Sequence, residues 1–208
     1  MILKKEFYAR SAMVVARDLL GCFLVRKIDG KILKSMIVET EAYEGMDDLA
    51  SHASHGRTPR NDVMFGEPGI CYVYLTYGMH HMLNIVTGKK DYPAAVLIRA
   101  VEPFFEIENP SSFETSARQR KTNGPAKLTK VLQIDRIFNK APVYVKKYGL
   151  WIEEGERIKK SEIVCAKRIG IDYAGKYKDK PWRFYIKDNK FVSKKDNFFC
   201  CMFFGGKI

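Results

Sequence analysis

Apolar and polar positions recur with two different periods along the chain, and each period predicts one kind of element. Helical spacing follows Ser11, an acceptable N-cap, through AMVVARDLL until Gly21. A second helix is expected at Pro125, because proline suits the first helical turn of PAKLTKVLQI. The strand-like runs are CFLVRKI, KILKSMIVETEAY, ICYVYLTY, MLNIVTG, AAVLIRAVE, LWIEE, EIVCAKRIGI and WRFYIKD. We therefore expect an α+β fold with a curved antiparallel sheet and peripheral helices.

The first two strand-like runs flank Asp29-Gly30, a dipeptide that supplies the positive φ angles of a tight hairpin. Side chains alternate along a strand, so the second arm of this hairpin places Glu39, Glu41 and Tyr43 on one face. That face is either solvated or part of a site.

Three stretches lack such periodicity. Residues 44–69 are rich in turn formers, and we expect a long functional loop with one helical turn near residues 47–51. Residues 103–123 are polar and mixed, whereas FFCCMFFGG near the C-terminus is strongly apolar. No internal repeat or linker interrupts the pattern, so the 208 residues are expected to form one domain.

Composition and charge add an expected partner. An apolar fraction of 46% with 12% aromatic residues favours a globular fold over disorder. The 36 basic residues exceed the 24 acidic ones, which gives a net charge of +12, and residues 105–208 hold 23 basic against 12 acidic residues. A field of this sign attracts polyanions such as nucleic acid. No run reaches the roughly 18 apolar residues that span a bilayer, and no secretion signal is recognised, so we expect an intracellular protein without membrane contact.

Glu41 and Arg99 are the first candidates for chemistry. Arg99 lies in the apolar run AVLIRAVE, where an unpaired charge is costly, so it needs a carboxylate partner, and Glu41 is a candidate. A carboxylate held in this way stays ionised and can act as a general base on water. The alternative is that Glu41 is only a solvated side chain.

Tyrosines form a second candidate set near these residues. Tyr43, Tyr72 and Tyr74 either belong to the core of the sheet or stack on a nucleobase. Tyr77 precedes Gly78 in a turn-like stretch, where an exposed aromatic side chain can separate base steps. Asn84 is either a satisfied core amide or a residue that meets a ligand.

Histidines and cysteines do not form a recognisable metal motif. His52 and His55 are spaced i, i+3, but neither H-E-x-x-H nor C-x-x-C accompanies them, and the zinc deaminase pattern is missing. We expect neither a metal nor another cofactor.

Eight blocks resemble the alkyladenine (3-methyladenine) DNA glycosylase family in order and spacing, and they cover nearly all of residues 5–192. The blocks are IVETEAY (37–43), DLASH (48–52), RTPRNDVMF (57–65), YVYLTYGMHHMLNI (72–85), AVLIRAVEP (95–103), NGPAKL (123–128), RIGIDYAG (168–175) and KPWRFY (180–185). The resemblance implies a hydrolase of base excision repair that flips damaged purines out of duplex DNA and hydrolyses the N-glycosidic bond.

The resemblance also assigns roles to residues. Glu41 matches the general base that activates water, and Arg99 matches the arginine that holds this water and the glutamate. Positions that match contacts to the base are Tyr43, Ala50, His52, Tyr74, Asn84 and Ile169. Tyr77 matches the residue that intercalates where the nucleotide leaves, and Met64 is expected to help on the opposite strand.

Two regions depart from the family pattern. Residues 104–121 do not follow its Met-x-x-Arg pattern, and Ala126 stands where glycine is common, which puts the DNA-facing helix of that region in doubt. The apolar tail from Phe198 has no recognised counterpart. Basic residues that are candidates for phosphate contacts are Lys127, Arg168, Lys176, Lys178 and Arg183, and the alternative for each of them is a solvated side chain.

The resulting hypothesis is a monofunctional enzyme that acts on double-stranded DNA as a monomer in the cytoplasm, nucleoid or nucleus. No lysine is recognised as poised for a Schiff base, so we expect no lyase activity. The alternative is a non-catalytic nucleic-acid-binding module that uses the same aromatic and basic residues. The sequence does not rank alkylated purines, hypoxanthine and etheno-adenine, because differences of about 1–3 kcal/mol decide among such ligands.

Overall fold

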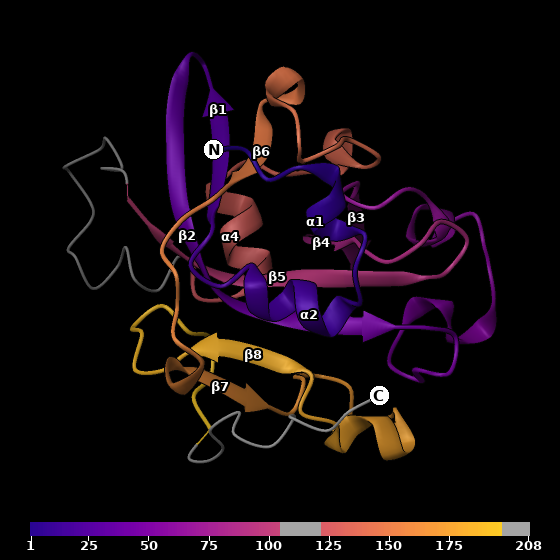
Figure 1. The fold of residues 1–208 in the computed structure, drawn as a ribbon. Coiled ribbons are helices and arrows are strands. Elements are labelled where there is room, and N and C mark those ends of the chain that lie inside the picture. Colours follow the sequence, from indigo (N-terminus) through magenta and orange to yellow (C-terminus); the bar gives the residue numbers. More distant parts are fainter. Residues whose placement is uncertain (105–121, 197–208) are drawn as a thin grey trace.

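The long strand β2 (Lys31–Glu44) is the centre of the sheet in the computed structural model, which describes residues 1–104 and 122–196 (Figure 1). The other strands are β1 (Phe23–Ile28), β3 (Cys71–Thr76), β4 (His80–Val86), β5 (Ala94–Pro103), β6 (Leu150–Glu153), β7 (Ile163–Ala166) and β8 (Arg183–Ile186). Their order is β3-β4-β5-β2-β1-β6, while β8 also pairs with β2 and β7 pairs with β8. Every pairing of these strands is antiparallel. The predicted α+β fold is confirmed.

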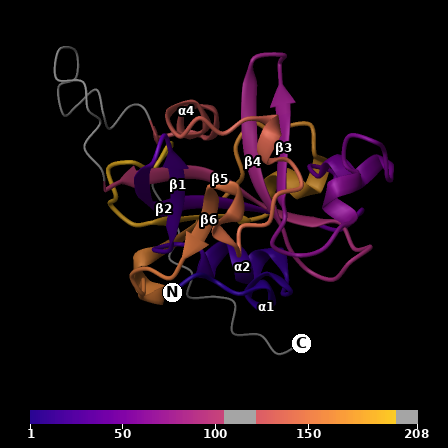
Figure 2. The same ribbon diagram turned by 90° about the horizontal axis from the view of Figure 1, so that it is seen from above.

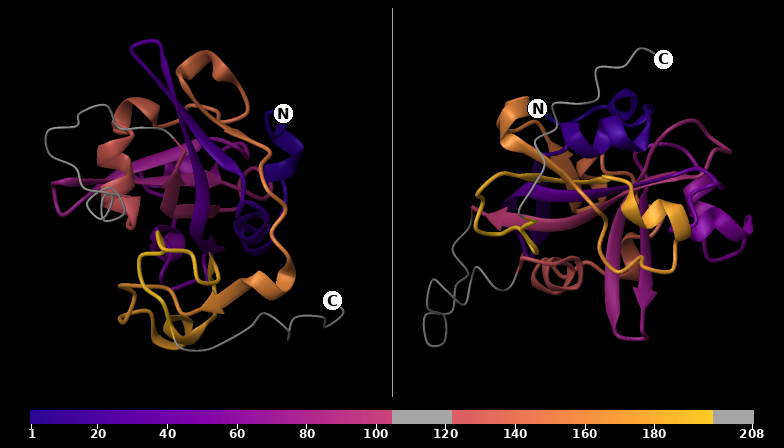
Figure 3. Two further views of the ribbon diagram at one scale, coloured as in Figure 1. Left: turned by 90° about the vertical axis from the view of Figure 1, so that its left-hand side faces the viewer. Right: turned by 90° about the horizontal axis from the view of Figure 1, so that it is seen from below.

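The helices cover both sides of the central strands. They are α1 (Lys5–Tyr8), α2 (Ala12–Asp18) and α4 (Pro125–Val131). Figure 2 shows α1 and α2 on one side of β2 and β5, with α4 and the projecting β3–β4 hairpin on the other, and Figure 3 agrees from below. One hydrophobic cluster joins residues of α2, α4 and the strands, so it fixes the helices to the sheet. No helix of the described residues is long and apolar enough to cross a membrane.

Caps, a proline and a turn dipeptide in the sequence predicted the positions of several elements correctly. The Ser11 side chain caps α2 by accepting a hydrogen bond from the Val14 backbone N–H (3.4 Å), and α4 begins with Pro125. Asp29 and Gly30 have φ angles of 47° and 81°, as a tight turn between β1 and β2 requires. These predictions from the sequence are confirmed.

Two local predictions are inexact. Residues 48–51 form one hydrogen-bonded turn, in which the Ser51 N–H donates to the Asp48 carbonyl at 2.8 Å, and the helical turns of the long loop follow it as the 3-10 helices η1 (His52–His55) and η2 (Asp62–Phe65). The run EIVCAKRIGI is not one strand, because β7 ends at Ala166 and the chain continues as a loop. The short helices not anticipated are α1, η3 (Arg136–Phe138), η4 (Lys146–Tyr148), η5 (Lys160–Glu162) and η6 (Gly175–Asp179). The expectations for residues 105–121 and for the tail from Phe198 lie outside the described residues.

The pairing of β2 with β5 is irregular next to Glu39, close to the candidate residues Glu41 and Arg99. The register runs from Ile37 opposite Val101 to Glu39 opposite Ala100, and shifts again immediately after Glu39. Such a bulge disrupts the ladder locally and re-aims side chains. Arg99 of β5 meets both Glu39 and Glu41 of β2 at this point.

Candidate active site

A cavity of about 330 Å³ opens between the β3–β4 hairpin, the loop around η1 and the loop after β7. Side chains of the sheet form its floor, and both loops supply its walls. The lining residues are Tyr43, Ala50, His52, Met64, Tyr72, Tyr74, Thr76, Tyr77, Met82, Asn84, Ala95, Leu97, Arg99, Pro125, Ile169, Gly170, Ile171 and Tyr173. The structure therefore brings together candidate residues that lie between positions 43 and 169 of the sequence.

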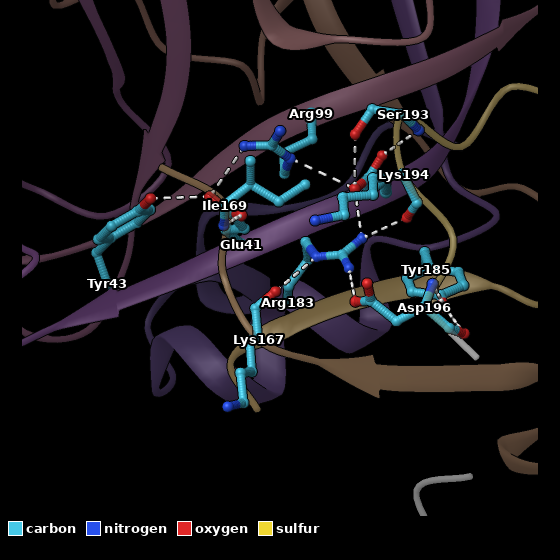
Figure 4. Close-up of polar contacts among 11 residues, drawn as sticks. Glu41, Tyr43, Arg99, Lys167, Ile169, Arg183, Tyr185, Ser193, Lys194 and Asp196 are labelled. Carbon is cyan, nitrogen blue, oxygen red and sulfur yellow. Dashed lines mark hydrogen bonds and ion pairs between the residues drawn. The ribbon is translucent and has the colours of Figure 1, made fainter. Parts of the chain in front are cut away.

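Glu41 lies directly behind this lining and is fully buried. The Tyr43 hydroxyl donates to Glu41 Oε2 and the Ile169 backbone N–H donates to Oε1, both at 2.8 Å (Figure 4). Arg99 Nη1 is 3.2 Å from Oε2. All three partners line the cavity, so the carboxylate is held by the wall that a bound molecule would meet.

Arg99 is 7% exposed, and the prediction that it needs a carboxylate partner is confirmed. Burial alone would lower the pKa of its guanidinium, but the charges of Glu41 and Glu39 outweigh burial and raise this pKa above its ordinary value. Arg99 therefore keeps its positive charge beside Glu41.

Aromatic rings of His52, Tyr72 and Tyr74 pack together in another part of the cavity lining. The ring of His52 lies 4.5 Å from that of Tyr74, edge to face, and His52 Nδ1 lies 2.9 Å from the Tyr72 hydroxyl. Burial lowers the pKa of His52, helped by the charge of Arg60, and burial raises the pKa of Tyr72 to about 12. Near neutral pH these rings are uncharged, polar at their edges and apolar on their faces.

Asn84 is 4% exposed and donates weakly to the carbonyls of Tyr72 (3.3 Å) and Met82 (3.5 Å). It also lines the cavity. The amide therefore has partners in the sheet and borders the cavity as well.

A buried ion pair fixes the two loops around the site. Arg168 Nη1 and Nη2 donate to Asp48 at 2.6 Å and 2.8 Å, and the Arg168 guanidinium packs 4.7 Å from the centre of the Tyr43 ring. Ala50, which lines the cavity, donates its N–H to Asp48 Oδ1 at 3.1 Å. The loop of Ala50, Tyr43 and the loop of Ile169 are thereby tied together.

The sequence model of the methylpurine-DNA glycosylase family matches residues 6–190. The chain belongs to this family. Three relatives named "Putative 3-methyladenine DNA glycosylase" are similar along nearly the whole chain. The relative from Carboxydothermus hydrogenoformans is 49% identical and covers 94% of this chain and 100% of its own length. The relative from Methanocella arvoryzae is 50% identical and covers 93% of this chain and 96% of its own length. The relative from Clostridium botulinum is 48% identical and covers 94% of this chain and 100% of its own length. The predicted resemblance is confirmed.

The two residues expected to insert into DNA are placed very differently in the structure. Tyr77 is 87% exposed at the tip of the β3–β4 hairpin, beside the cavity mouth, with a φ angle of 49°. Met64 is only 2% exposed and packs in a cluster with Phe65 and Tyr72. Its burial does not fit an intercalating side chain, so we do not retain that role for Met64.

Two of the candidate phosphate contacts are buried in ion pairs. Arg168 is 5% exposed and paired with Asp48, and Arg183 is fully buried and paired with Glu39. Neither guanidinium is available to a phosphate. Lys127, Lys176 and Lys178 are exposed and remain candidates.

Sequence reasoning missed Tyr173, which is 72% exposed and lines the cavity mouth. It lies in YAGKYKDK, which was interpreted only as a basic loop. The block RIGIDYAG of the family resemblance contains it and was the available signal. Among the described residues, no group of three or more His, Cys, Asp or Glu side chains is arranged to hold a metal ion.

Proposed function

We propose that this protein is a monofunctional DNA glycosylase that flips a damaged purine into the cavity and hydrolyses its N-glycosidic bond with a water activated by Glu41. The observation that carries the proposal is the buried Glu41 carboxylate, fixed by Tyr43, Arg99 and Ile169 behind an aromatic cavity. Membership of the methylpurine-DNA glycosylase family and the names of the relatives support it.

In the proposed step, Glu41 takes a proton from water while the water oxygen attacks C1′ of the sugar. The bond between C1′ and the purine nitrogen breaks, and its electron pair leaves with the base. A cationic alkylated purine departs as a neutral molecule, so it needs no general acid. The negative charge of Glu41 stabilises the oxocarbenium-like sugar, and Arg99 keeps the carboxylate oriented.

The cavity wall suits a flipped purine. Tyr43, His52 and Tyr74 offer aromatic faces, and stacking on such faces contributes about 1–3 kcal/mol per base. We assign Asn84, Ala50 and the Ile169 backbone to screening and holding the base and the water, since all three border the cavity. The relatives' names favour 3-methyladenine among the candidate bases.

Duplex DNA is the proposed partner, bound by a monomer inside the cell. Tyr77, exposed at the hairpin tip, fills the gap that the flipped nucleotide leaves. The net charge of +12 provides attraction to the phosphate backbone. Of the described residues, no lysine lines the cavity, which supports direct hydrolysis without strand cleavage.

The test is base release in single-turnover reactions with duplexes that carry 3-methyladenine, 7-methylguanine, hypoxanthine or etheno-adenine, in the presence of EDTA. We expect a free purine and an intact abasic strand, with no adduct trapped by borohydride. Tight, salt-sensitive binding without release from any duplex would favour the non-catalytic binding module instead.

A further inference from the structure

A second glutamate shares Arg99 with Glu41. Glu39 is fully buried, and its Oε1 lies 3.4 Å from Arg99 Nε, while Arg99 Nη1 lies 3.2 Å from Glu41. Arg99 Nε forms no hydrogen bond with the described residues, so its contact with Glu39 is ionic. One guanidinium thus faces two buried carboxylates, and Glu39 does not line the cavity.

Arg183 supplies Glu39 with a cation of its own. Arg183 Nη1 donates to Glu39 Oε1 at 2.9 Å, and neither side chain is exposed. Without this pair, two buried negative charges would compete for Arg99, which is unfavourable in a site of low polarity. The pairing of Glu39 with Arg183 therefore leaves Arg99 free to hold Glu41.

The segment after β8 fixes the same glutamate. The Ser193 backbone N–H donates to Glu39 Oε2 at 2.7 Å, and the Ser193 hydroxyl donates to Oε1 at 2.9 Å. Arg183 is held in turn by the Lys194 carbonyl (2.8 Å) and by Asp196 (Figure 4). A carboxylate with this many donors has one orientation, and so does the arginine that it faces.

A second route leads from Arg183 to Glu41 through the backbone. Arg183 Nε donates to the Lys167 carbonyl at 2.7 Å, and two residues later the Ile169 N–H donates to Glu41 Oε1 at 2.8 Å. Figure 4 shows Arg183 between the Glu41 side of the network and Asp196. Arg183 thus helps to fix both oxygens of Glu41, one through Arg99 and one through Ile169.

We propose that Glu39 and Arg183 are positioning residues of the glycosylase site, which set the geometry of Arg99 and of the Ile169 N–H around Glu41. They touch neither the cavity nor the substrate. The inference rests on the proposed function, because its readout is the rate of base release.

The experiment compares Glu39→Gln and Ser193→Ala with wild type in single-turnover release of 3-methyladenine and in binding to the same duplex. Misplacing a catalytic group by about 1 Å can cost on the order of 100-fold in rate. We expect Glu39→Gln to lower the rate by about 10- to 100-fold and Ser193→Ala to lower it several-fold, with little change in affinity for the lesion duplex. Ser193→Ala keeps the test valid if Glu39→Gln does not fold.

Ser35→Ala is the matched control, because it removes a fully buried β2 hydroxyl that has no hydrogen-bond partner among the described residues. Its rate should equal that of wild type. A double-mutant cycle then asks whether Glu39 acts through Arg99. Once Arg99→Gln has removed the guanidinium, Glu39→Gln should lower the rate by much less than it does alone.

The outcomes separate the inference from the proposed function. Release by wild type with an unchanged rate for Glu39→Gln would overturn the inference alone. The inference would also be overturned if Glu39→Gln lowered the rate by the same factor in the Arg99→Gln background as it does alone. It would likewise be overturned if Ser35→Ala lowered the rate as much as Ser193→Ala does. If wild type releases no purine, both the proposed function and the inference fail.

Discussion

Replacing Tyr43 with phenylalanine removes one hydrogen bond from Glu41 and leaves the ring in place. The Tyr43 hydroxyl is 2.8 Å from Glu41 Oε2, and its ring packs 4.7 Å from the Arg168 guanidinium. A hydrogen bond to a charged group contributes about 1.5–3 kcal/mol. Glu41 keeps Ile169 and Arg99 as partners, so we expect the lower end of this range, about 1.5 kcal/mol, or roughly a tenfold slower reaction.

The assay is single-turnover release of 3-methyladenine with enzyme in excess, together with the affinity for the same duplex. Burial, and after it the charge of Glu41, raises the pKa of Tyr43 well above its ordinary value, so the hydroxyl remains a donor up to at least about pH 10. The rate ratio of wild type to Tyr43→Phe should therefore be constant from pH 6 to pH 9. Tyr8→Phe is the control, because the buried Tyr8 hydroxyl has no hydrogen-bond partner among the described residues. Equal rates for wild type and Tyr43→Phe would refute the reasoning.

Three further predictions concern stability and DNA. Asp48→Ala leaves Arg168 buried without its carboxylate and should lower the free energy of unfolding, measured in urea titrations, by about 3–5 kcal/mol. The control Lys167→Ala breaks the exposed pair with Asp179 and should lower this free energy by at most about 1 kcal/mol. Burial lowers the pKa of His52, so below about pH 6.5 the unfolded chain binds a proton that the folded chain does not, and the free energy of unfolding should decrease as the pH is lowered. His52→Gln should flatten this dependence, and an unchanged slope would contradict it. Tyr77→Ala should slow release from duplexes more than from single strands; equal losses would argue against intercalation.

Local chemistry made much of the fold predictable. The hairpin of β1 and β2 follows from two adjacent residues, Asp29 and Gly30, and α2 from one cap and a helical period. The pairing of Arg99 with Glu41 followed from the cost of an isolated charge in an apolar strand. Each of these inferences needs only neighbours in sequence or a single physical rule.

What escaped prediction depends on contacts between distant segments. Arg183 lies in the strand WRFYIKD, and the argument applied to Arg99 would also have demanded a carboxylate for it. Instead it was counted as a phosphate contact, because the net charge of +12 suggested DNA. Its partner Glu39 is 144 positions away in the sequence. The loop of Ile169 was misjudged for a similar reason, since an apolar run looks like a strand whether or not a neighbouring strand continues beside it.

The rate and the affinity of Glu41→Gln, measured on one duplex that carries 3-methyladenine, test the central claim most directly. Glutamine preserves the size of the side chain but cannot accept a proton from water. The account predicts an affinity close to that of wild type and base release slower by about 100-fold or more, because general-base catalysis contributes at least about 100-fold to a rate. Release at the wild-type rate would contradict the assignment of Glu41 as the catalytic base.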